Sequence, residues 1–174
     1  LALYSHLKGR TLLQHPTLKR DFISLVAKPA TQKEAIKALE TMFHSRGIAT
    51  IPDGEKFVMI VPDSLTNFVS PRAANIAAES AGKAGAQSNA ALPSGSVYFL
   101  NTPFAQVAMV YKELVGASKL DGIEKFVRVP VTFQSTTPLT RAEVVYALDT
   151  MFEWDNIKMV REEGGVLRVE HIQK

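Results

Sequence analysis

One stretch of this chain occurs twice, and the duplication constrains the fold more than any other feature. Residues 29–43 and 138–152 are identical at eight of fifteen aligned positions, where unrelated sequences of average composition would match at about one. Such a repeat divides a chain of 174 residues into two smaller folding problems. The identical residues are of types that cap helices and build cores, so the repeat predicts structure and not a catalytic group.

Each copy of the repeat predicts an amphipathic helix. Thr31 and Thr140 stand three residues before a glutamate, the capping-box spacing that satisfies free N–H groups at a helix start. Gly47 and Asn156 are suitable residues for the helix ends. Between these limits, apolar residues recur on one helical face. They are Ala35, Ile36, Leu39, Met42 and Phe43 in the first copy, and Val144, Val145, Leu148, Met151 and Phe152 in the second.

The repeat continues on both sides of this helix. Residues 3–9 and 110–116 share Tyr, Leu and Gly in register and predict an earlier helix. The apolar runs 22–26 and 127–133 each predict a strand before the capped helix. Strand–turn–strand hairpins are predicted after it, at 48–61 and 157–170. Each copy therefore reads helix, strand, helix, strand, strand.

These elements predict an α+β fold of two repeated small modules, with helices packed on small sheets. The second module has an extra leading strand, residues 96–100, so we expect the chain to begin inside the first helix of its first module. Residues 63–95 are rich in Ala, Ser and Gly with few large apolar groups, which predicts a flexible linker. The predicted domains are therefore 1–62 and 96–174, each near the size at which a single core is barely sufficient.

Charge is distributed unevenly between the modules. Residues 1–62 carry nine basic and five acidic side chains, a net charge of +4, whereas residues 96–174 carry nine basic and ten acidic ones, a net charge of −1. Solvated surfaces account for most charge in any soluble protein. The sharper interpretation is that a basic and a mildly acidic module present different surfaces to partners.

The residues show no pattern that predicts an active site. The chain has no cysteine, which excludes disulfides, zinc–thiolate sites and thiol catalysis. Nucleophile-elbow, Walker and GxGxxG patterns are missing as well. We therefore expect no enzyme, no cofactor and no metal site. The histidines lack metal-ligand spacing; they are His6, His15, His44 and His171.

A GxxG segment in the linker offers an alternative. Residues 82–85, Gly-Lys-Ala-Gly, resemble the loop with which KH domains clamp a nucleic-acid backbone. A KH loop joins two helices within a module, whereas this segment lies in an Ala/Gly-rich stretch, so we expect no nucleic-acid partner. A KH-like binder remains the alternative, since the sequence pI is about 9.2. A ligand pocket between the modules also remains open.

The order of elements resembles the periplasmic N-terminal domains of secretins, the outer-membrane ring proteins of type II secretion and type IV pilus systems. The nearest pattern is that of the secretin and TonB N-terminus short domain. Its helix end fits 7–11 and 114–116, and its capped helices fit those at Thr31 and Thr140. Its closing hairpin fits residues 54–62, whereas the second copy lacks the final proline.

The resemblance implies a non-enzymatic region of an outer-membrane-associated protein, located in the periplasm. In that family such domains stack into rings or dock other proteins of the secretion machinery. The partners implied here are other secretion-system proteins or copies of the same chain. A second implied possibility is the signalling domain of a TonB-dependent receptor type.

A partner contact is predicted in the first closing hairpin. Phe57, Val58, Met59 and Ile60 are apolar on both faces of a strand, and an unprotected apolar edge strand is either covered or used for binding. The alternative is that this strand is central in its sheet and covered by helices.

Overall fold

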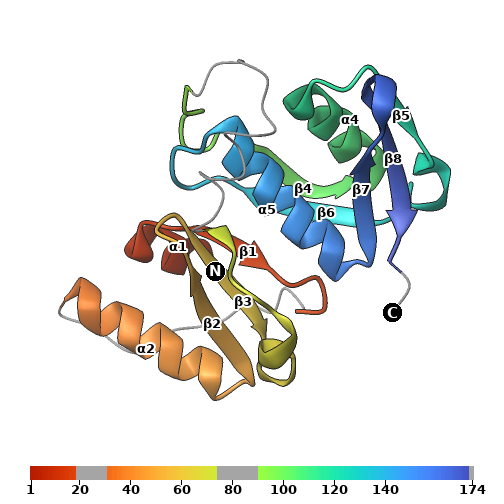
Figure 1. Cartoon of the computed structure of the whole chain (residues 1–174). Helices are drawn as coiled ribbons and strands as arrows, with labels where there is room; N and C mark the ends of the chain where they lie inside the picture. Colours follow the sequence, from red (N-terminus) through yellow and green to blue (C-terminus); the bar gives the residue numbers. More distant parts are fainter. Residues whose placement is uncertain (19–30, 74–89, 173–174) are drawn as a thin grey trace. The chain divides into compact units, whose positions relative to one another are not determined.

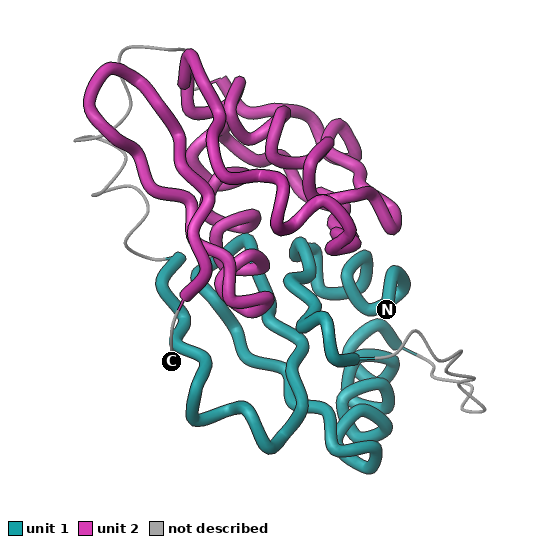
Figure 2. Tube along the Cα trace, turned by 90° about the vertical axis from the view of Figure 1, so that its right-hand side faces the viewer, with its two compact units in different colours: residues 1–74 teal, residues 75–174 magenta. Residues whose placement is uncertain are grey.

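The computed structural model describes residues 1–18, 31–73 and 90–172. The chain divides into two compact units, residues 1–74 and 75–174 (Figure 2). Each unit combines helices with small sheets, so the α+β fold class predicted from the sequence is confirmed.

The described part of unit 1 contains a three-stranded sheet and two α-helices (Figure 1). Strand β3 lies in the centre, parallel to β1 on one side and antiparallel to β2 on the other. The predicted hairpin is therefore present as β2 and β3. The elements are α1 (Ala2–Lys8), β1 (Thr11–Gln14), α2 (Gln32–His44), β2 (Ile48–Asp53), β3 (Phe57–Pro62) and the 3-10 helix η1 (Asp63–Phe68).

Unit 2, as far as its residues are described, has two sheets and two long helices. Strands β4 and β6 form an antiparallel pair, and β8 lies between β5 and β7 in a separate three-stranded sheet. Helix α4 contacts β4, β5 and α5. The elements are β4 (Tyr98–Pro103), α4 (Phe104–Val115), β5 (Lys119–Asp121), η3 (Ile123–Lys125), β6 (Pro130–Gln134), α5 (Arg141–Trp154), β7 (Ile157–Arg161), η4 (Glu163–Gly165) and β8 (Val166–His171).

The helix boundaries follow the capping residues. Thr31 accepts a 3.2 Å hydrogen bond from the Glu34 amide at the start of α2. At α5 the capping box is complete, because Thr140 accepts from the Glu143 amide and the Glu143 carboxylate accepts from the Thr140 amide at 2.7 Å. Asn156 adopts the predicted left-handed conformation after α5, with φ of 58°.

An apolar core joins the helices to the central strand in unit 1. Tyr4, Leu39 and Phe43 of the helices pack with Val58 and Ile60 of β3. The rings of Tyr4 and Phe43 meet edge to face, with centroids 5.2 Å apart, a favourable aromatic geometry. The repeat positions predicted for the core are thus buried at Leu39 and Phe43.

The core of unit 2 is richer in aromatic contacts. The Phe152 ring of α5 lies 4.9 Å from that of Phe104 and 5.9 Å from that of Tyr111, both on α4. Leu148 is fully buried and Met151 is 7% exposed. Four of the five core positions predicted in the second copy are therefore buried, and Val145 is half-buried.

The sequence missed the two strands that pair in parallel. Strands β1 and β5 have only four and three residues, and each pairs with the last strand of its unit. Because the partner strand is distant in sequence, no turn residues next to such a strand indicate its presence. The strand predicted at 127–133 is shorter and begins later, as β6, and the one predicted at 22–26 lies outside the described residues.

The predicted linker at 63–95 is ordered at both described ends. Residues 63–68 form η1 of unit 1, and the buried carboxylate of Asp53 accepts a 2.7 Å hydrogen bond from the Ala73 amide. At the other end, Leu92 pairs with Leu139 in an antiparallel bridge. Domain limits of 62 and 96 are therefore wrong by several residues, and residues 74–89 lie outside the described part.

The three-stranded sheets of the two units have the same plan. In each, the last strand lies in the centre, parallel to the strand after the first helix and antiparallel to its hairpin partner. A two-stranded sheet like β4–β6 is described only in unit 2. That the units are copies of one module stays a prediction.

Candidate functional site

The predicted partner-binding residues lie in the interior. Strand β3 has a paired strand on each side, so Phe57–Ile60 presents no free edge, and these four side chains are at most 2% exposed. The prediction of an exposed edge here is wrong, and the central-strand alternative is correct. By contrast, Arg168 and Glu170 of the corresponding strand β8 are exposed, as expected of a strand with one solvated face.

Most outer strands of the three-stranded sheets carry protection against further pairing. Proline cannot donate to a ladder, and charged side chains discourage strand addition. Pro52 lies in β2, Lys119 and Asp121 lie in β5, and Lys158 and Arg161 lie in β7. These edges are poor candidates for strand pairing with another chain.

Strand β4 differs from these edges. Among the described residues it pairs with β6 on one side only. Its sequence YFLNTP contains no charged residue, and its proline, Pro103, is the last residue of the strand. Tyr98 and Leu100 are 55% and 53% exposed. An uncharged strand with exposed apolar side chains is the type of edge that binds an added strand.

A bulge shapes the middle of β4. One extra residue separates Phe99 from Thr102 relative to their partners on β6, and Asn101 has a φ of 53°. The Asn101 amide donates a 2.8 Å hydrogen bond to the Thr132 hydroxyl. A bulge redirects side chains and increases local twist, so the regular part of the edge is the segment that precedes Asn101.

Helix α4 exposes a second apolar area. Its inner face buries Phe104, Val107, Ala108 and Tyr111, whereas Met109 and Val110 on the outer face are 51% and 40% exposed. Gln106 and Glu113 are exposed one turn to either side. The outer face therefore has an apolar centre with polar ends.

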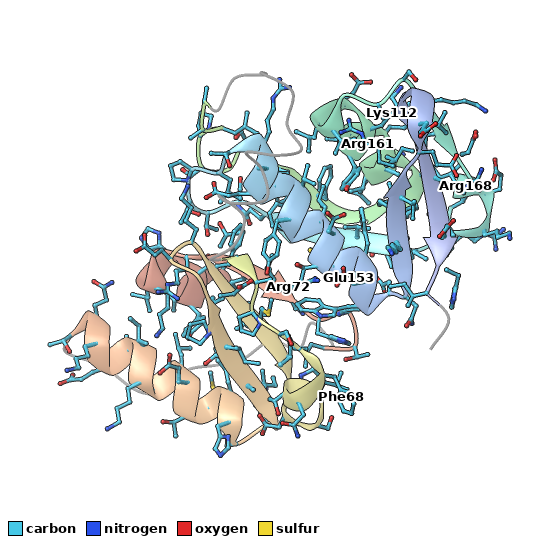
Figure 3. The ribbon with its side chains drawn as sticks, viewed as in Figure 1. Phe68, Arg72, Lys112, Glu153, Arg161 and Arg168 are labelled. Carbon is cyan, nitrogen blue, oxygen red and sulfur yellow. The ribbon has the colours of Figure 1, made fainter. Side chains whose placement is uncertain are left out.

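Among the described aromatic side chains of unit 1, Phe68 alone is exposed. Phe68 ends the short helix η1 and is 81% exposed (Figure 3). Exposed leucines occur near the chain start, at Leu1 and Leu3. A fully exposed phenylalanine loses the stabilisation that burial of its ring would supply.

The titratable groups of unit 1 with shifted pKa values take part in contacts that stabilise the fold. Burial, followed by the hydrogen bond to Glu40, raises the pKa of Tyr4. Burial acts to raise the pKa of Glu40 as well, but hydrogen bonds from Lys8 and Tyr4 hold it below its usual value. These groups join α1 to α2.

Unit 2 contains a corresponding tyrosine–carboxylate pair and one further carboxyl group with a shifted pKa. Burial, and then the charge and hydrogen bond of Asp149, raise the pKa of Tyr111. Burial raises the pKa of Asp155, the residue that ends α5, to about 6. No group of three or more His, Cys, Asp or Glu side chains within the described ranges could hold a metal ion.

Two further observations concern the nucleic-acid-binding alternative and the possibility of a membrane-spanning helix. The GxxG segment at 82–85 lies outside the described residues, so the structure does not test the KH alternative. None of the helices in the described part of the chain has the length and apolar character that a membrane crossing needs.

The sequence analysis missed the surfaces that the structure exposes. It identified residues 96–100 as a strand, but whether a strand is central or peripheral depends on pairings that are distant in sequence. The uncharged run 97–100 was the available signal, because natural edge strands usually contain a charge. For Phe68 and Met109 the sequence contained no signal, since large apolar residues in helices are usually buried.

None of the family models, curated proteins or solved structures compared with this chain matches it.

Proposed function

We propose that this chain is a protein–protein interaction region of a secretin-like outer-membrane protein, placed in the periplasm, where it assembles with copies of itself or docks other secretion proteins. Three elements that carry the resemblance are present in both units: a first helix ending at a left-handed glycine, a capped second helix and a closing hairpin. The strand predicted directly before the capped helix is described in unit 2 alone, as β6. From this similar order of helices and strands, the proposal infers a function like that of the secretin N-terminal domains.

The edge of β4 carries the proposal. Binding by strand addition needs an open edge, and the unpaired main-chain groups then supply affinity while alternate side chains supply specificity. Tyr98 and Leu100 project from this edge with about half of their surface exposed. Strand β1 is also an uncharged outer strand, but its side chains are buried or half-buried, whereas the other outer strands of the three-stranded sheets contain a proline or charged residues.

The experiment places a charge on the edge of the parent protein. Leu100→Lys should abolish assembly or partner binding, because a lysine at the centre of an added strand pair costs desolvation and blocks close approach. Val127→Lys is the matched control, since Val127 is an exposed apolar residue of the same unit at 43% exposure. Native gels and sedimentation measure assembly, and circular dichroism verifies the fold of each variant.

Two results would contradict the proposal. One is assembly of the Leu100→Lys parent at wild-type level with an intact fold. The other is oligonucleotide binding by the 174-residue chain that decreases steeply with salt, because that dependence is the signature of phosphate contacts and would favour the KH alternative.

A further inference from the structure

Phe68 is held in place from both ends of the segment that carries it. The Asp63 amide donates a 2.8 Å hydrogen bond to the Gly47 carbonyl at the start of η1. At the far end, the Ala73 amide donates to the fully buried carboxylate of Asp53 at 2.7 Å. Residues 63–73 therefore form a tethered segment. Ordering a side chain on such a segment costs less conformational entropy on binding than ordering a free loop.

The segment also has internal support. The Thr66 hydroxyl donates a 2.9 Å hydrogen bond to the Asp63 carbonyl within η1. Leu65 and Val69 are partly buried, whereas Phe68 between them is 81% exposed. Pre-organised aromatic side chains are the typical anchors of protein interfaces, so Phe68 has the properties of an anchor.

Unit 2 exposes a surface that suits an aromatic anchor. Met109 and Val110 are adjacent on the outer face of α4, at 51% and 40% exposure. Methionine adapts its shape to a partner and makes favourable sulfur–aromatic contacts. The bulged edge of β4 suits Phe68 less well, because strand addition needs an extended partner backbone and Phe68 belongs to a 3-10 helix.

Net charge disfavours unit 1 of a second copy as the surface that Phe68 meets. Unit 1 carries ten basic and six acidic residues, a net charge of +4, and unit 2 carries ten basic and eleven acidic ones, a net charge of −1. Contact between two copies of unit 1 would therefore bring like charges together, whereas contact of unit 1 with unit 2 would not. The outer face of α1, with exposed Leu3, is disfavoured on this ground.

We propose that Phe68 of one copy packs on Met109 and Val110 of a second copy. This contact joins different surfaces of the two chains, so it is head-to-tail and propagates into a ring or a filament. The inference rests on the self-assembly part of the proposed function. It assigns one contact of that assembly and leaves the edge of β4 available for a partner.

The absence of cysteine from the chain makes a direct test possible. Asn67→Cys and Gln106→Cys replace exposed neighbours of the contact and keep Phe68, Met109 and Val110. They are made in separate copies, one of which carries a tag, and the mixed copies are oxidised. A disulfide between the two variants should form in preference to others, because the contact holds the two positions close together while they sample the short distance that a disulfide spans. Gel electrophoresis without reductant identifies the mixed dimer by its mass.

The matched control places the second cysteine on helix α1 of unit 1 and not on helix α4 of unit 2. Leu3→Cys lies on the outer face of α1, where Leu3 is 56% exposed, and Gln106 is exposed as well. Asn67→Cys mixed with Leu3→Cys should give little mixed dimer. Equal yields from both mixtures would show random collision and overturn the proposal, as would preferential dimerisation of Asn67→Cys with itself.

Self-association of the chain without introduced cysteines provides an independent test of the contact. Phe68→Ala should weaken self-association by about 30-fold in sedimentation experiments, the effect of a hot-spot residue worth 2 kcal/mol. A wild-type chain that stays monomeric at millimolar concentration would overturn the proposal. If Leu100→Lys blocks assembly of the parent while both tests fail, only the head-to-tail contact is refuted. If the cross-link forms while Leu100→Lys has no effect, the β4 edge is refuted instead.

Discussion

The hydroxyl of Tyr4 donates a 2.8 Å hydrogen bond to Oε1 of Glu40 and so joins α1 to α2. The ammonium of Lys8 lies 2.8 Å from the same oxygen. In unit 2, Tyr111 of α4 is hydrogen-bonded to Asp149 of α5. Glu40 and Asp149 occupy the same position of the sequence repeat, so a tyrosine–carboxylate bond connects the first and second helix in each unit.

Removing either hydroxyl should destabilise its unit. Tyr4→Phe and Tyr111→Phe keep the buried ring but delete the donor, and we expect each to lower the free energy of unfolding by about 1–2 kcal/mol, typical for a bond to a charged group. The loss should be smaller at Tyr4, because Glu40 retains Lys8 and is 36% exposed to screening solvent. Denaturant unfolding measures both, and a larger loss at Tyr4 would contradict this ranking.

Truncation of the repeated leucine should destabilise both units. Leu39→Ala and Leu148→Ala each leave a cavity, and we expect losses of about 2–5 kcal/mol. Leu148 is fully buried whereas Leu39 is 6% exposed, so the Leu148 variant should lose more. Thermal unfolding followed by calorimetry tests the prediction. A variant that melts at the wild-type temperature would show that its leucine is not in a core.

Gly122 should not tolerate a side chain. Its φ is +79°, and an added Cβ would lie 2.7 Å from the Val169 carbonyl oxygen of the central strand. Gly9 provides the control, because it has a φ of +61° with open space around it. Gly9→Ala should cost about 1 kcal/mol from backbone conformation alone, and Gly122→Ala should cost clearly more. Equal unfolding midpoints of the two variants would contradict the close approach.

Asp155 should make stability depend on pH. Burial raises its pKa in the folded state to about 6, from the usual 3.8. Between pH values equal to these two pKa values, the folded state holds a proton that the unfolded state has released. The free energy of unfolding should therefore decrease as the pH increases from about 4 to 6, and it should remain at the lower value above about pH 6.

The variant Asp155→Asn tests this pH dependence. It cannot ionise, so it should be more stable than the wild type at pH 7.5, by a margin that shrinks towards pH 4. An amide also avoids a negative charge at the C-terminal end of α5. Denaturant titrations at several pH values provide the measurement. A margin that does not change with pH would show that Asp155 is not the group responsible.

The amino-acid sequence by itself determined the local structure of this protein. The Thr140–Glu143 capping box, the left-handed Asn156 and the hairpins are decided by residues a few positions apart, and the structure contains them. The α+β class follows from these elements. Buried Leu39 and Leu148 follow from helical periodicity, because each helix must bury one face.

Only the tertiary structure decided which surfaces are free. Strands β1 and β5 join their sheets through parallel pairing with β3 and β8, and that pairing places Phe57–Ile60 in the interior and not at an edge. The exposure of Leu100 and Phe68 likewise depends on which distant segments pack nearby. Periodicity reveals that a strand is apolar, but a strand becomes central or peripheral only when remote partners close around it.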